Sequence, residues 1–261
     1  MRAAATAAVL LLLAAGCGGG RKPLDAKGKA LPTLAARCHV HVDATVGWFR
    51  ASDGVLLDGA VLGSGPTGVV LAHEYPNDLC GWARYAHVLA RAGFRVLLFD
   101  HRHYGLSESP TDPAQAGRYS RDLAGGVAEL KREGAKRVFL MGGSFGAITS
   151  IVAGSRLGSK IAGVISVSGE ELLGNDNGPN EELDAIDAVP KLRAPFLVLN
   201  SRHDTVALVS AARDLERRAG SAHKRLVLFP GGDHGWDLLT AAPYRARASA
   251  DVIHFLRRYG R

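Results

Sequence analysis

The sequence predicts one open α/β domain, a mostly parallel, doubly wound sheet of about eight strands with helices on both faces. The 261 residues are 47% hydrophobic and 22% charged, which is ordinary for a globular domain. From Val46 onward, apolar runs alternate with helical patterns at short intervals, as in sheets built from strand–helix–strand units. The runs after Thr67 are continuously apolar, which a strand covered on both faces requires.

Eight runs are expected to form strands: Val46–Ala51, Leu56–Leu62, Thr67–Ala72, Phe94–Phe99, Arg137–Met141, Ile161–Val167, Pro195–Asn200 and Lys224–Phe229. The first two flank a Ser-Asp-Gly turn and therefore read as an antiparallel pair. Five longer segments have apolar residues at helical spacing or small apolar residues throughout: Gly81–Ala92, Arg118–Glu133, Phe145–Arg156, Val206–Ala219 and Ala242–Arg258. The insert 169–193 is expected to be a short lid containing one acidic helix, Asn180–Val189.

Residues 1–16 have the features of a secretory signal peptide, with Arg2 followed by the apolar run Ala7–Ala15. This run is too short to cross a bilayer as a helix. It ends in Ala-Ala-Gly-Cys17, which resembles a bacterial lipobox. The resemblance implies lipidation of Cys17, a flexible tether over 17–37, and a protein anchored to the outer face of the membrane. A plain signal peptide with an incidental cysteine, giving a secreted protein, is the alternative.

The folded domain is expected over residues 38–261, without a second domain. The formal net charge of the whole chain, +7, comes from scattered Lys and Arg, without a dense run or an aromatic platform, so nucleic acid is not an expected partner. Export allows a disulfide between Cys38 and Cys80, although two free thiols are also compatible with the sequence. No cluster has metal-ligand spacing, so neither a metal nor a cofactor is expected. We expect a monomer.

The pattern Gly142-Gly143-Ser144-Phe145-Gly146 fits G-x-S-x-G. The pattern alone is weak, because chance gives about 0.2 matches in a chain with this composition. Its context is specific, because it follows a predicted strand and opens a predicted helix, as a nucleophile elbow does. Ser144 is therefore the candidate nucleophile, and the amide of Phe145 is expected to face a developing oxyanion.

The base that activates Ser144 should follow it in the chain. His234 lies in a Gly-rich loop directly after the last predicted strand, and it is preferred to His203. Asp204 follows the strand before that one and is the candidate acid that orients the imidazole. The competing interpretation makes Asp204 the N-cap of the helix from Val206, and both roles fit only if one oxygen stays free.

The loop after Thr67–Ala72 begins His73-Glu74-Tyr75. The order of all these segments resembles the α/β-hydrolase superfamily, in particular small bacterial esterases and dienelactone-hydrolase-like members, from about Val46 to the end. The resemblance implies that the Tyr75 amide joins that of Phe145 in the oxyanion hole. Glu74 departs from the glycine usual there, and either turns away or binds a cationic part of the substrate. Dienelactone hydrolases use Cys as nucleophile, so Ser144 favours simple esters.

These features predict a serine hydrolase of small carboxylic esters that works through a Ser144-His234-Asp204 triad and an acyl-enzyme. The short lid indicates an open site for small or exposed acyl groups. A serine peptidase or amidase on the same fold is the nearest alternative. A non-catalytic lipoprotein that uses the fold only for binding is an alternative from a different class.

Overall fold

The computed structural model describes residues 31–172 and 181–261. Residues 32–261 form one unit, and the description below concerns this unit. The expected signal peptide, Cys17 and most of the expected tether lie outside the described residues. None of the helices in the described ranges is long and apolar enough to cross a membrane.

One sheet of eight strands runs through this unit in the order β1-β2-β4-β3-β5-β6-β7-β8. The strands are β1 Thr45–Arg50, β2 Leu56–Leu62, β3 Thr67–Ala72, β4 Arg95–Phe99, β5 Arg137–Gly143, β6 Gly163–Val167, β7 Phe196–Ser201 and β8 Lys224–Phe229. β2 pairs antiparallel with β1 and β4, and the remaining neighbours are parallel. The predicted fold class is confirmed.

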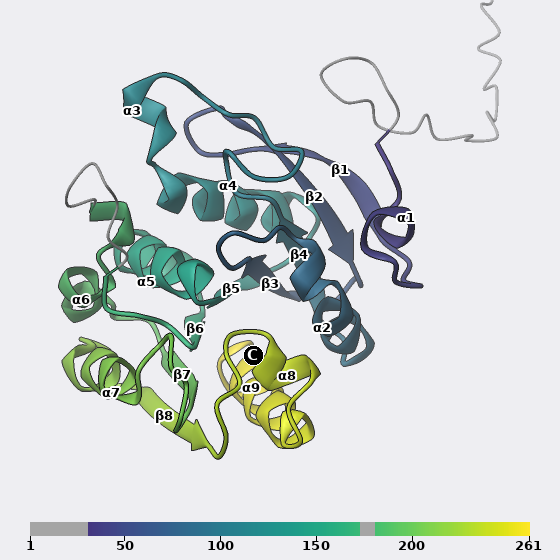
Figure 1. Ribbon diagram of the computed structural model, residues 1–261. Coiled ribbons are helices and arrows are strands. Elements are labelled where there is room, and N and C mark those ends of the chain that lie inside the picture. The colour runs from purple at the N-terminus through teal and green to yellow at the C-terminus, as the bar shows by residue number, and fades with distance from the viewer. Residues whose placement is uncertain (1–30, 173–180) are drawn as a thin grey trace, which may run out of the picture. The chain divides into compact units, whose positions relative to one another are not determined.

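Helices cover both faces of this sheet (Figure 1). One face is covered by α4 Tyr119–Arg132, α5 Phe145–Leu157, α6 Ala185–Ala188 and α7 Val209–Arg218. The other face is covered by α1 Leu34–Cys38, α2 Cys80–Arg91, α8 Asp237–Thr240 and α9 Arg245–Tyr259. A short helix α3, Pro113–Ala116, lies in the connection between β4 and α4. Because both faces are covered, β3, β5 and β6 consist almost entirely of buried residues.

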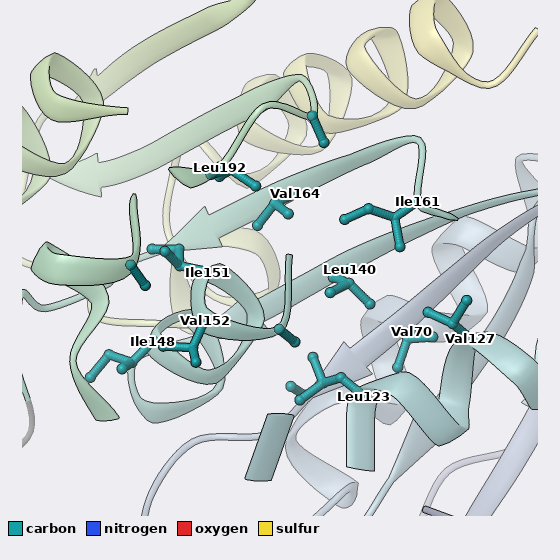
Figure 2. Close-up of a cluster of buried hydrophobic side chains, with 14 of the residues drawn as sticks. Val70, Leu123, Val127, Leu140, Ile148, Ile151, Val152, Ile161, Val164 and Leu192 are labelled. Carbon is teal, nitrogen blue, oxygen red and sulfur yellow. The ribbon is translucent and has the colours of Figure 1, made fainter. Parts of the chain in front are cut away.

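The core against α5 explains why this helix consists of small apolar residues. Every residue from Phe145 to Gly154 is buried, because α5 packs on β5 and β6 and is flanked by α4 and α6. Figure 2 shows Ile148, Ile151 and Val152 of α5 in one cluster with Leu140 and Val164 of the sheet. This packing fixes the start of α5, where Ser144 lies, relative to the strands.

The α1 segment differs from the expected tether, which extended to residue 37. Thr33 caps α1 by accepting a hydrogen bond from the Ala36 amide, and Cys38 forms a disulfide with Cys80, the first residue of α2. The Arg37 guanidinium binds three carboxylates, those of Asp58 at 2.6 Å, Asp100 at 2.7 Å and Asp78 at 3.0 Å. The disulfide and these ion pairs hold α1 on the domain, so the tether prediction extends too far.

Two predicted helices also differ in extent. The helix expected over Asn180–Val189 consists, in its described part, of the 3₁₀ turn η2 Glu181–Leu183, the short helix α6 and the 3₁₀ turn η3 Val189–Lys191. Asp184 caps α6 by accepting a hydrogen bond from the Asp187 amide, and so starts a new helix inside the predicted one. The helix expected from Val206 begins at Val209, because the amides of Val206 and Ala207 donate to the Asp204 carboxylate in a turn before it.

Candidate active site

Ser144 lies at the sharp turn between β5 and α5. Its backbone has φ 48° and ψ −117°, a conformation that residues with a side chain rarely adopt. The Ser144 amide donates to Val167 O of β6 at 2.9 Å, which anchors the turn to the neighbouring strand. Such strain persists only where the surrounding structure fixes it, and here it matches the nucleophile elbow predicted from the sequence.

Two glycines of the motif are required by close packing. A Cβ on Gly142 would lie 2.1 Å from the carbonyl oxygen of Gly146, and a Cβ on Gly146 would lie 2.2 Å from Ala72 O of β3. The absence of a Cβ on Gly142 allows the tight turn. The absence of a Cβ on Gly146 lets α5 begin directly against the end of β3. The start of α5 therefore lies beside the loop that carries Tyr75.

Asp204 and His234 form a hydrogen-bonded pair on the loops after β7 and β8. His234 Nδ1 lies 2.9 Å from Oδ2 and 3.1 Å from Oδ1 of Asp204. Oδ1 also accepts the amides of Val206 at 2.9 Å and Ala207 at 3.0 Å, and this turn delays the start of α7. The capping role and the imidazole-orienting role of Asp204 are thus both filled, with Oδ2 left for His234.

The electrostatics of this pair favour an ion pair. Burial alone would raise the pKa of Asp204, but the hydrogen bonds from His234 and Val206 outweigh it and lower that pKa. Burial alone would lower the pKa of His234, but the hydrogen bond to Asp204 and the charges of Asp204, Glu74 and Glu170 raise it. The imidazolium that forms when His234 takes a proton is therefore stabilised.

The two predicted oxyanion donors are the backbone amides of Tyr75 and Phe145. Neither amide has a hydrogen-bond acceptor among the described residues. The Glu74 carbonyl, on the same peptide as the Tyr75 amide, accepts hydrogen bonds from His73 Nδ1 at 2.8 Å and the Asn77 amide at 2.9 Å. A trans peptide points its N–H opposite to its C=O. Fixing this carbonyl therefore fixes the direction of the Tyr75 N–H.

His73 supports this arrangement, a role that the sequence analysis missed. Its Nε2 accepts the His101 amide at 3.1 Å, so Nδ1 carries the proton that is donated to the Glu74 carbonyl. Burial and the neighbouring His101 lower the pKa of His73 to about 3, so the ring is neutral at physiological pH. A His directly after a buried strand was the available sequence signal.

Glu74 points toward the loop that carries His234. Its side chain is buried, and Oε1 accepts the Trp236 amide at 2.6 Å. A Cβ on Gly143 would lie 2.5 Å from Oε1, and a Cβ on Gly235 only 1.7 Å from it. The residue before Ser144 and the residue after His234 thus pack against the same carboxyl group.

His101 and Asp100 contribute to the structure of the loop after β4. His101 Nδ1 lies 3.1 Å from Asp122 Oδ2, while Asp100 binds Arg37. Within residues 31–172 and 181–261, no group of three His, Cys, Asp or Glu side chains is arranged to hold a metal ion.

Comparisons with known proteins agree with this architecture. A family profile described as the alpha/beta hydrolase fold matches residues 68–191. Epoxide hydrolase 3 of Siraitia grosvenorii is 34% identical over 99 residues, which are 37% of this chain and 30% of that protein. The match thus spans less than a third of that relative's length.

Two solved structures are similar over much more of the chain. An esterase of Pyrococcus furiosus has a TM-score of 0.71 at 19% identity, with 93% of this chain and 99% of that chain covered. The enol-lactonase of Burkholderia xenovorans has a TM-score of 0.64 at 21% identity, with 80% and 99% covered. Together with the profile match and the strand order, these likenesses show that the chain has the α/β-hydrolase fold.

Proposed function

We propose that this protein is a serine hydrolase that cleaves small carboxylic esters through the Ser144-His234-Asp204 triad and an acyl-enzyme. The observation that carries the proposal is the pairing of His234 with Asp204 on loops at the sheet edge where the strained turn presents Ser144. The Ser144 hydroxyl forms no hydrogen bond to any residue in the described ranges, which leaves it available to His234 and to a substrate.

In this mechanism the Ser144 Oγ attacks the ester carbonyl carbon, and its proton passes to Nε2 of His234. The amides of Tyr75 and Phe145 donate hydrogen bonds to the carbonyl oxygen as it becomes negative. His234 returns the proton to the leaving alkoxide, which departs as the alcohol. Water, deprotonated by the same imidazole, then hydrolyses the ester between the acyl group and Ser144.

The chemistry of serine favours esters over epoxides, although the curated relative named above is an epoxide hydrolase. A serine oxygen that opened an epoxide would form an ether, which an imidazole and water cannot hydrolyse. A serine oxygen that attacks an ester forms a new ester, which the same site can hydrolyse. Of these two substrate classes, turnover through Ser144 therefore fits the ester.

The surroundings of the site favour an exposed acyl group of modest size. Five large apolar side chains are exposed in the loops that follow β3, β4, β6 and β7: Tyr75, Leu106, Leu172, Val206 and Leu208. These loops leave the sheet at the edge where Ser144 and Asp204 lie. The described part of the lid insert contains only short elements, which supports the proposal of an open site.

A fluorophosphonate probe tests the proposal, because it labels only an activated serine. We expect labelling of the wild type and none of Ser144→Ala, together with hydrolysis of p-nitrophenyl acetate that falls to background in the variant. Turnover of peptide amides in preference to esters would support the peptidase alternative instead. Absence of both labelling and turnover in a folded protein would support the binding lipoprotein and reject the enzyme.

A further inference from the structure

The buried carboxyl group of Glu74 lies where three parts of the site meet. Glu74 belongs to the loop after β3 that carries the Tyr75 amide, and only 6% of the residue is exposed. Its carboxyl group packs against Gly143 of the elbow and against Gly235 of the loop that carries His234.

The hydrogen bond from Trp236 makes this contact specific. Glu74 Oε1 accepts the Trp236 amide at 2.6 Å, a short distance typical of a charged acceptor. The Trp236 ring packs on the start of α2, where a Cβ on Gly81 would lie 2.2 Å from it. Trp236, which follows His234 closely in the chain, is therefore held by its backbone on Glu74 and by its ring on α2.

Glu74 also acts on His234 through charge. A negative charge on Glu74 raises the pKa of His234, and the charge of His234 in turn favours the ionised form of Glu74. Burial is the larger effect on Glu74 and raises its pKa to about 7, with the charges of Asp237 and Asp204 acting in the same direction. The titratable groups that act on Glu74 from the elements around it are thus His234, Asp237 and Asp204.

We propose that Glu74 is a positioning residue, which clamps the His234 loop to the oxyanion loop and tunes the imidazole by its charge. This inference rests on the proposed function for its catalytic consequence, but the clamp itself is a property of the folded chain. This role of Glu74 also explains why a carboxylate lies beside the proposed oxyanion hole. Its Oε1 binds the Trp236 amide, and its negative charge favours the imidazolium that forms during the reaction.

Three substitutions separate the clamp from the charge. Glu74→Gln keeps an oxygen that can accept the Trp236 amide but removes the charge. Glu74→Asp keeps the charge and withdraws the carboxylate by one methylene. Glu170→Gln is the matched control, because the charge of Glu170 also raises the pKa of His234 while Glu170 accepts no hydrogen bond from the His234 loop among the described residues.

Nuclear magnetic resonance of the full folded domain measures both effects without turnover. We expect Glu74→Gln to lower the titration midpoint of the His234 imidazole by about one pH unit, the low end of the effect of one nearby charge. Trp236 amide exchange should stay slow in this variant and in Glu170→Gln. In Glu74→Asp the same amide should exchange at least about tenfold faster, because its acceptor is withdrawn.

The acid limb of kcat/KM for p-nitrophenyl acetate should move to lower pH in Glu74→Gln by the same amount as the imidazole titration. An unchanged His234 titration in Glu74→Gln, or an unchanged Trp236 exchange rate in Glu74→Asp, overturns the proposal. If the fluorophosphonate test fails while both resonance results hold, the clamp stands and the enzymatic function is rejected. If labelling succeeds and the resonance results fail, the function stands and Glu74 has no positioning role.

Discussion

At the scale of single residues, the Asp204 carboxylate holds a turn of the fold and, in the proposed mechanism, also orients the catalytic imidazole. Oδ1 accepts two backbone amides that form the turn before α7, and Oδ2 receives the Nδ1–H of His234. The amide hydrogen bonds hold the carboxylate in one orientation, and this orientation fixes Nδ1 of the imidazole and leaves Nε2 for the role proposed for it. The geometry of the turn is thus part of the geometry of the site.

Asp204→Asn tests this dual role, because asparagine keeps an oxygen for the Val206 and Ala207 amides. The asparagine NH₂ would face Nδ1, so the imidazole would carry its proton on Nε2 and could not accept one from Ser144. We expect kcat to fall by about 10⁴-fold, as for other triads with the wrong tautomer. The midpoint of thermal unfolding, measured by circular dichroism, should change little. A variant that loses its fold, or one that keeps most of its activity, would contradict this assignment.

Sequence reasoning found the residues that follow strands and missed those whose role depends on contacts between distant loops. Ser144, Asp204 and His234 could each be placed at a strand end from local pattern alone, and the Asp204–His234 contact followed. The direction of the Glu74 side chain could not, because it depends on the packing of Gly143 and Gly235, which are 92 residues apart in the chain. The sequence left two alternatives for Glu74, and neither included a contact with the His234 loop.

At the scale of elements, long periodic or continuously apolar segments were predictable and short ones were not. The eight strands and five long helices lie within a few residues of their expected bounds. The short helices α1, α3 and α8 were missed, because four or five residues hold too few positions to display a helical period. Tertiary contacts hold such segments, as the disulfide and Arg37 do for α1.

The disulfide between α1 and α2 is expected to contribute substantially to stability. Cys38 and Cys80 are 42 residues apart, and closing a loop of this length in the unfolded chain corresponds to about 4 kcal/mol in the chain-entropy model. A double variant, Cys38→Ser with Cys80→Ser, should therefore unfold at a clearly lower urea concentration than the oxidised wild type. Such a bond also suits the oxidising compartment that export would provide.

Reduced wild-type protein is the control for this measurement. If the bond itself is responsible, wild type in excess reductant should unfold at the same urea concentration as the double variant. Equal midpoints for the oxidised and reduced wild type would mean that the Arg37 ion pairs alone hold α1, and the prediction would be wrong.

At the scale of the whole molecule, the sheet decides where function is located. Parallel strands bring their carboxyl ends to one edge, so the loops after β3, β5, β7 and β8 meet although they span residues 73 to 236. The sequence predicted this convergence because it follows from strand direction. It could not predict the buried ionic cluster on the side of α1, since Arg37 lies in a segment that resembles a tether.

That cluster makes the stability of the molecule depend on pH. Arg37 is one cation among the carboxylates of Asp58, Asp78 and Asp100, so negative charge is in excess. Burial, together with the charge of Asp100, raises the pKa of Asp58 to about 7 despite the opposing effect of Arg37. At pH values between the ordinary pKa of an aspartate and about 7, Asp58 is therefore protonated in the folded protein and ionised in the unfolded chain.

A group that binds a proton more tightly in the folded state stabilises the fold at low pH, and this contribution disappears as pH rises through the folded pKa. Urea unfolding at pH 5, 6, 7 and 8 should therefore show wild type losing stability relative to Asp58→Asn as pH rises, by about 1.4 kcal/mol per pH unit at most. Glu74 changes stability in the same direction and His73 in the opposite one, but both act equally in the two proteins and cancel in the difference.

Asp43→Asn, at an exposed position, is the matched control, and its stability should change with pH in parallel with that of wild type. If Asp58→Asn also runs parallel to wild type over this range, the proton is not held at Asp58, and Arg37 suffices to keep all three carboxylates ionised.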